Sequence, residues 1–66
     1  MSERPITMSE LRACGMCSRG TKTWFEAHGL DFKAFLRDGI AAEELLATGD
    51  GLGIRAVVLV RSKRSV

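Results

Sequence analysis

Cys14 and Cys17 are separated by two residues, and this spacing is the sharpest chemical pattern in the sequence. Two thiolates spaced in this way are able to bind one metal ion or to exchange as a dithiol. A tetrahedral zinc site needs four ligands, so the single histidine, His28, and an acidic neighbour such as Asp31 would have to complete it. A redox dithiol belongs in a βαβ context that this chain lacks. We therefore expect free thiols, with Cys14, Cys17 and His28 as the candidate ligands if a metal is bound.

Other catalytic groups do not gather around these residues. His28 stands next to Gly29, where a histidine interacts with the last helix carbonyls and with the negative end of the helix dipole. No second acid, nucleophile or glycine-rich phosphate loop accompanies it. A chain of 66 residues has little room for a deep cleft and its supporting shell. We expect a binding protein that is not an enzyme and uses no cofactor.

The charge is divided along the chain. Residues 1–25, 26–50 and 51–66 carry net charges of +2, −4 and +4. An acidic middle is able to steer encounter with a basic partner, although charge runs are also common on solvated faces that bind nothing. Asp31 and Asp50 are explained as helix caps. The predicted partner-binding residues are the remaining carboxylates, Glu26, Asp38, Glu43 and Glu44.

A helix-turn-helix reading of residues 18–39, with its turn at Gly29, is the first alternative. Two details oppose it. Phe25 is bulky where close helix packing favours a small residue, and the would-be recognition helix, Asp31 to Asp38, carries no net charge. In this reading nonspecific contacts to the DNA backbone would come from the basic tail: Arg61, Lys63 and Arg64.

The elements that position these groups are short helices. Thr7 and Glu10 have the spacing of a capping box, which starts a first helix that runs to about Cys14. Ser18 and Asp31 are predicted N-caps of the next two helices. Gly29, Gly39 and Gly49 each close a helical stretch. The predicted helices after the first are 18–28, 31–38, 41–48 and 52–60, the last favoured over a strand because a strand would lack a partner. Residues 61–66 form a basic tail.

These elements predict an all-α fold, a compact bundle of about five short helices. The predicted core consists of Leu11, Trp24, Phe25, Leu30, Phe32, Phe35, Leu36, Ile40, Leu45, Leu46, Ile54, Val57 and Val60. The final helix is expected to be apolar around most of its circumference and central to this core. We expect one domain, 1–66, with flexible ends at 1–5 and 62–66, as a monomer or a weakly associating protein. The sequence has no membrane span and no secretory signal, which predicts a cytoplasmic protein.

About half of the chain carries a pattern that resembles known proteins. The block from Cys17 to Ile40, CSRGTKTWFEAHGLDFKAFLRDGI, followed by ELLATGD from Glu44, is similar to short helical accessory proteins of bacteriophages and prophages. Anti-CRISPR inhibitors are one characterised class of small phage proteins, and they share no motif from which residue roles could be transferred. The resemblance implies a phage accessory protein with a protein partner. The preferred hypothesis is a protein in the bacterial host cytoplasm that binds and inhibits a host protein or ribonucleoprotein complex, with a CRISPR effector as the candidate target. A DNA-binding regulator and a virion assembly or structural protein are the alternatives.

Overall fold

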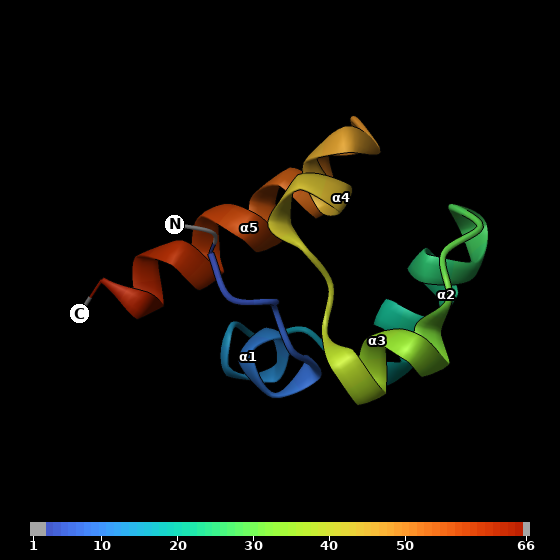
Figure 1. Ribbon diagram of the computed structural model, residues 1–66, viewed down its shortest axis with the longest axis horizontal. Helices are drawn as coiled ribbons and strands as arrows, with labels where there is room; N and C mark the ends of the chain where they lie inside the picture. The colour runs from blue at the N-terminus through green and yellow to red at the C-terminus, as the bar shows by residue number, and fades with distance from the viewer. Residues whose placement is uncertain (1–2, 66) are drawn as a thin grey trace.

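The computed structural model describes residues 3–65 and forms five helices along them. The helices are α1 (Met8–Ala13), α2 (Ser18–Ala27), α3 (Phe32–Asp38), α4 (Ala42–Ala47) and α5 (Gly51–Arg64). Figure 1 shows α4 and α5 together on one side of the molecule and α1, α2 and α3 on the other. The predicted all-α class with about five short helices is confirmed.

Local capping explains where the helices begin. Glu10 N–H donates to Thr7 Oγ1 at 3.3 Å, and Thr7 N–H donates back to Glu10 Oε1 at 3.2 Å, which confirms the capping box. Asp31 Oδ1 accepts a hydrogen bond from Ala34 N–H at 3.0 Å, as predicted for an N-cap. Ser18 is not the cap of α2: Cys17 takes that place, because its Sγ accepts from Gly20 N–H at 3.3 Å, and Ser18 is the first helical residue.

Glycine ends the helices as predicted. Gly29, Gly39 and Gly49 have φ angles of 67°, 80° and 70°, and Gly15 has a φ of 90° after α1. This left-handed region is costly for residues with a Cβ. Gly39 is also sterically required, because a Cβ there would lie 2.7 Å from Cβ of Pro5. The glycines therefore separate the helices and allow the N-terminal segment to pass close to the end of α3.

A single antiparallel β-bridge joins Ile6 to Ile40, the one isolated bridge found within residues 3–65. Ile6 N–H donates to Ile40 O at 2.8 Å, and Ile40 N–H donates to Ile6 O at 2.9 Å. Both side chains are buried. The bridge fixes the segment before α1 against the connection between α3 and α4.

The core differs from the predicted one in both directions, since Ile6, Met8, Ala42 and Ala56 are buried without having been predicted and three predicted residues are exposed. Leu36, Leu46 and Ile54 are exposed by 53%, 36% and 41%, so their assignment to the core is wrong. Trp24, Leu30 and Phe32 are only partly buried and pack against the core cluster. The buried hydrophobic residues are Ile6, Met8, Leu11, Phe25, Phe35, Ile40, Ala42, Leu45, Ala56, Val57 and Val60.

Helix α5 is longer and more one-sided than predicted. It is a helix, which confirms that choice over a strand, and Asp50 caps it through Leu52 N–H at 2.8 Å. It continues to Arg64, so the prediction of a tail outside the helix from residue 61 is wrong. Only one face of α5 is buried, and Val58 on the opposite face is 59% exposed. The helix therefore lies at the edge of the core, not at its centre.

The C-terminal turn of α5 is held by the N-terminal segment. Arg61 Nη2 donates to Glu3 Oε1 at 2.8 Å, and Arg64 Nη2 donates to Glu10 Oε1 at 2.7 Å and to Pro5 O at 3.0 Å. These charge-assisted contacts keep the last turn helical. The contacts join the two ends of the described chain, and Val66 lies outside the described residues.

Candidate functional site

Helix α2 presents one outward face and one inward face. Phe25 points into the core and is 1% exposed, while Trp24 is partly buried at its edge. Residues 19, 22, 23 and 26 follow the i, i+3, i+4, i+7 spacing of one helical stripe, and all four are exposed. We call this stripe the α2 outer face; it consists of Arg19, Lys22, Thr23 and Glu26.

The two cations of the α2 outer face make no ion pair within residues 3–65. No carboxylate lies within 4.0 Å of Arg19 or Lys22 there, in contrast to Arg61 and Arg64, which are held by Glu3 and Glu10. Thr23 donates its hydroxyl proton to Arg19 O at 3.1 Å, so its oxygen still has a free acceptor position. The outer face thus offers two positive charges, a hydroxyl and a carboxylate to solvent.

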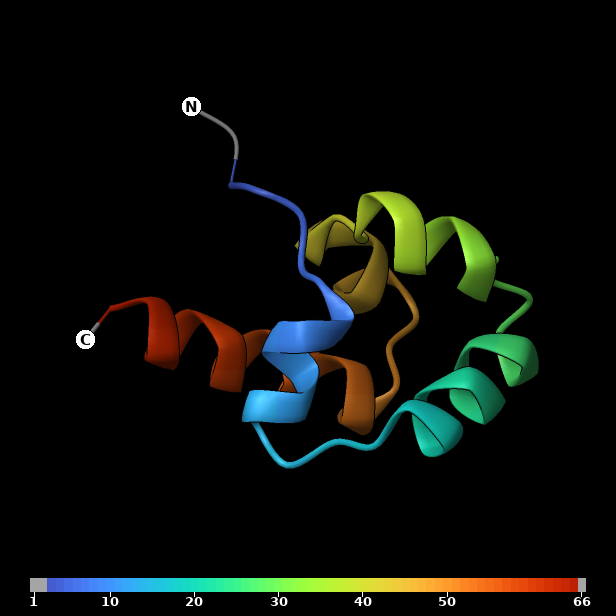
Figure 2. The same cartoon turned by 90° about the horizontal axis from the view of Figure 1, so that it is seen from below.

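A four-residue connection, residues 14–17, leads from α1 into α2. Gly15 N–H donates to Arg12 O and Met16 N–H donates to Leu11 O, each at 3.0 Å, which closes α1 with a left-handed glycine. Cys17 then caps α2 directly. The two helices are therefore joined by a short, hydrogen-bonded turn, and Figure 2 shows that they do not continue along a common axis.

Further basic side chains lie around the C-terminal end of α1. Arg4, Lys63 and Arg64 line a hollow together with Ala13 and Cys14. The side chain of Arg4 is 73% exposed, and its Nη2 lies 3.9 Å from Glu10 Oε2, whereas the side chain of Arg64 is largely buried. This end of the molecule is positively charged, because Arg4, Arg61, Lys63 and Arg64 outnumber the two carboxylates Glu3 and Glu10.

The predicted partner-binding carboxylates are exposed but are distributed over three helices. Glu26 lies on the α2 outer face, and Asp38 ends α3, where Arg37 Nε contacts its Oδ2 at 3.0 Å. Glu43 and Glu44 occupy the first turn of α4, where the positive end of the helix dipole favours them. Asp38 is therefore partly neutralised, while the other three retain exposed carboxylates.

The candidate metal ligands are not brought together. Cys14 and Cys17 are free thiols, and His28 lies at the other end of α2 from Cys17. Eleven helical steps of about 1.5 Å place the backbones of Cys17 and His28 about 16 Å apart, too far to share one ion. No group of three or more histidine, cysteine, aspartate or glutamate side chains within the described part of the chain is placed to hold a metal.

His28 instead contacts the start of α5. Its Nε2 lies 3.2 Å from Asp50 Oδ2, and its ring centroid is 4.3 Å from that of Trp24. The pKa of Asp50 is lowered chiefly by the hydrogen bond from Leu52 N–H; burial opposes this effect, and Trp24 and His28 add to it. The Trp24 indole is near enough to Asp50 to influence it, but its buried Nε1 has no hydrogen-bond partner within residues 3–65. The cluster joins the end of α2 to the N-cap of α5, a contact that the sequence reading missed.

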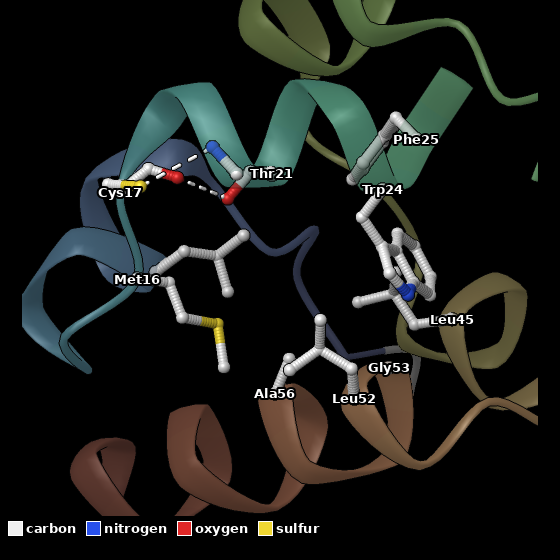
Figure 3. Close-up of a pocket in the computed structure, with 11 residues that line it drawn as sticks. Met16, Cys17, Thr21, Trp24, Phe25, Leu45, Leu52, Gly53 and Ala56 are labelled. Atoms are coloured by element: carbon white, nitrogen blue, oxygen red, sulfur yellow. Dashed lines mark hydrogen bonds between the residues drawn. The ribbon is translucent and has the colours of Figure 1, made fainter. Parts of the chain in front are cut away.

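An apolar pocket lies between the inward face of α2 and helix α5 (Figure 3). Its volume is about 200 Å³. Thr21 and Trp24 line it from α2, and Leu52 and Ala56 line it from α5 (Figure 3). The complete lining is Leu11, Met16, Cys17, Gly20, Thr21, Trp24, Phe25, Leu45, Leu52, Gly53 and Ala56. The sequence placed these residues in the predicted core, in the helices 18–28 and 52–60 or in the connection before Ser18, and predicted no pocket, because the pocket depends on how far apart α2 and α5 pack.

No family model, curated protein or solved structure shows significant similarity to this chain. The helices within residues 3–65 are each too short, or too polar, to cross a membrane.

Proposed function

We propose that the protein is a non-enzymatic binding protein that recognises double-stranded DNA through α2. Helix-turn-helix proteins join two helices by a turn of three or four residues that often contains glycine, and they place the second helix in the major groove. Here α1, the turn with Gly15 and α2 supply that order of elements. The pair differs from the predicted one, which used Gly29 as the turn and α3 as the reading helix.

The chemistry of the α2 outer face suits this role. Arginine and lysine donate to guanine or to phosphate, threonine contacts any base, and glutamate accepts from cytosine. Arg19 and Lys22 lie in the first half of α2, where the positive end of the helix dipole also favours phosphate. An α-helix is about 10–12 Å across with its side chains, which matches a major groove about 12 Å wide.

Three of the competing cations are already paired. On α3, Arg37 is bound to Asp38, and Leu36 is exposed beside it. Of the three residues predicted to contact the DNA backbone, Arg61 and Arg64 are held by carboxylates of the N-terminal segment, whereas Lys63 is exposed and makes no ion pair within residues 3–65. The two helices that flank the turn carry Arg12, Arg19 and Lys22, and none of these makes an ion pair within the described residues, which is the observation that carries the proposal.

The test is fluorescence anisotropy with a labelled DNA duplex at several salt concentrations. Replacing Arg19 and Lys22 together by alanine removes two phosphate-competent charges, so we expect the slope of log K against log salt to fall by about 1.8. The matched control removes the same charge from α3, as Lys33→Ala with Arg37→Ala, and is expected to retain the wild-type slope.

Two results would contradict the proposal. One is equal loss of affinity in the two double variants, which would indicate attraction by overall charge alone. The other is wild-type binding after loss of Arg19 and Lys22. Selection of bound duplexes from a random library then shows whether α2 reads a sequence, because base-edge contacts discriminate by about 1–3 kcal/mol for each pair.

A second candidate function is binding to a host protein or ribonucleoprotein complex, including a CRISPR effector. Glu26, Glu43 and Glu44 favour it, because they are exposed and no cation lies within 4.0 Å of their carboxylates in the part of the chain that the structure describes. Affinity capture from a bacterial lysate with wild type and with Glu43→Gln/Glu44→Gln tests it. A partner that both forms capture equally well would exclude the α4 carboxylates as the contact.

A further inference from the structure

The pocket between α2 and α5 exists because its walls lack side-chain volume. Gly20 on α2 and Gly53 and Ala56 on α5 carry one side-chain carbon among them. The larger side chains Trp24 and Leu52 stand between the helices and hold the walls apart, as Figure 3 shows. The resulting hollow of about 200 Å³ is open to solvent on one side, where Leu52 is 48% exposed.

The volume of the pocket limits the size of a ligand that could occupy it. Cavities of about 150 Å³ lined by aliphatic and aromatic side chains stay dry and bind benzene, whereas drug-sized ligands need about 300–1,000 Å³. A hollow of about 200 Å³ therefore fits one six-membered ring with a short substituent. It is too small for a nucleotide, a cofactor or a peptide segment.

The lining selects an uncharged occupant. No lysine, arginine, aspartate or glutamate lines the pocket. Its polar groups are already engaged: the Thr21 hydroxyl donates to Cys17 O at 2.8 Å, and Cys17 Sγ accepts from Gly20 N–H at 3.3 Å. A charged ligand would lose hydration without gaining a partner, which is costly.

Trp24 gives one wall a flat aromatic surface, and aromatic rings pack favourably against each other in offset or edge-on arrangements. Its indole Nε1 is buried and lies near Asp50, so the pocket meets the apolar ring surface of Trp24 and not this donor. We propose that this pocket is a binding site for a small, uncharged, single-ring aromatic molecule.

Occupancy would act on the opposite side of α2. The helix forms one wall of the pocket through Gly20, Thr21 and Trp24, and it carries Arg19 and Lys22 on its outer face. A ligand that packs against the inward face of α2 would therefore change the affinity of the α2 outer face for DNA. This consequence rests on the proposed function, whereas occupancy of the pocket does not.

The experiment is a titration of the purified full chain with toluene, followed by Trp24 fluorescence and by two-dimensional NMR of the backbone amides and the indole N–H. Trp24 is the only tryptophan, so the emission comes from a single residue in the pocket wall, and the NMR shifts show whether the change is confined to the pocket. We expect saturable changes confined to lining residues. Benzoate, which replaces the methyl group by a carboxylate, is expected to cause none.

Two substitutions with the same chemical change test the location. Ala56→Leu places three more carbons in the pocket and should weaken toluene binding at least about ten-fold. Ala47→Leu makes the same change on the exposed side of α4 and should bind as the wild type does. If Ala56→Leu is not folded by circular dichroism, Leu52→Gln at the exposed rim takes its place, with the same expected loss.

Several outcomes would overturn the proposal. They are an absence of saturable change with toluene, equal binding of benzoate, undiminished binding in a folded Ala56→Leu or Leu52→Gln, and a concentration-dependent dimer in which Leu52 of a second copy fills the pocket. The titration contains no DNA, so its failure is distinguishable from failure of the α2 outer face to bind DNA.

Discussion

Gly53 is the glycine at which adding a single methyl group should destabilise the fold most. A Cβ at this residue would lie 2.9 Å from Leu45 O, 3.1 Å from Trp24 Cζ2 and 3.2 Å from Thr48 Oγ1, all closer than ordinary van der Waals contact. The nearest atom is a backbone oxygen, which cannot rotate away. Gly53→Ala must therefore push α5 away from α4.

The magnitude follows from two opposing effects. Alanine in place of glycine inside a helix gains about 1 kcal/mol, whereas overpacking a close contact costs about 1–3 kcal/mol. Since the backbone contact of Gly53 cannot relax by rotamer change, we expect the upper part of that range and a net loss of about 1–2 kcal/mol. For a domain of this size that lowers the melting temperature by about 4–16 °C.

The matched control is Gly51→Ala in the same helix. A Cβ at Gly51 would meet nothing within 4 Å, so this change should stabilise the fold by up to about 1 kcal/mol. Thermal and urea unfolding followed by circular dichroism measure both variants, and Trp24 emission reports displacement at the contact. Equal stabilisation by the two alanines would refute the close approach of α5 to α4.

Two further predictions concern the contacts between the N-terminal segment and the last turn of α5. Arg64→Ala removes the hydrogen bonds to Glu10 and to Pro5 O and should lower the free energy of unfolding in urea by about 1–2 kcal/mol. The control Lys63→Ala should change it by less than about 0.5 kcal/mol. Equal losses in the two variants would show that Arg64 is not a structural residue. The pKa of Glu10 is lowered from 4.5, first by its hydrogen bond from Arg64, so its stabilisation is complete above about pH 4.5 and is lost as the pH falls through the lower folded-state pKa. Melting temperatures measured from pH 7 to pH 2 should therefore fall less steeply for Glu10→Gln than for the wild type, and parallel curves would contradict this linkage.

The candidate site was only partly predictable from the sequence. The helical spacing of Arg19, Lys22, Thr23 and Glu26 is present in the sequence, but a stripe becomes an outer face only when Trp24 and Phe25 are known to pack inward. The helix-turn-helix alternative weighed from the sequence placed the turn at Gly29, because several glycines have the same local character. Our proposal places the turn at Gly15, since the helix that follows it carries Arg19 and Lys22 without ion pairs within residues 3–65.

Local interactions explain what the sequence determined by itself. The capping box at Thr7, the caps at Asp31 and Asp50, and the glycine stops involve groups within about six residues of each other, so a local sequence pattern is enough to predict them. They defined five helices and the all-α class, with most helix ends correct to within one or two residues. The exception is the end of α5, where the contacts of Arg61 and Arg64 span more than fifty residues.

Only the tertiary structure decided which apolar residues are buried and where space remains. Leu36, Leu46 and Ile54 have the same hydrophobicity as buried neighbours, and the packing of one helix against another leaves them exposed. The Ile6–Ile40 bridge and the pocket under α2 depend likewise on the separation of elements that are distant in sequence. Periodicity specifies directions around a single helix axis, whereas burial and cavities depend on the distance between axes, which no local pattern encodes.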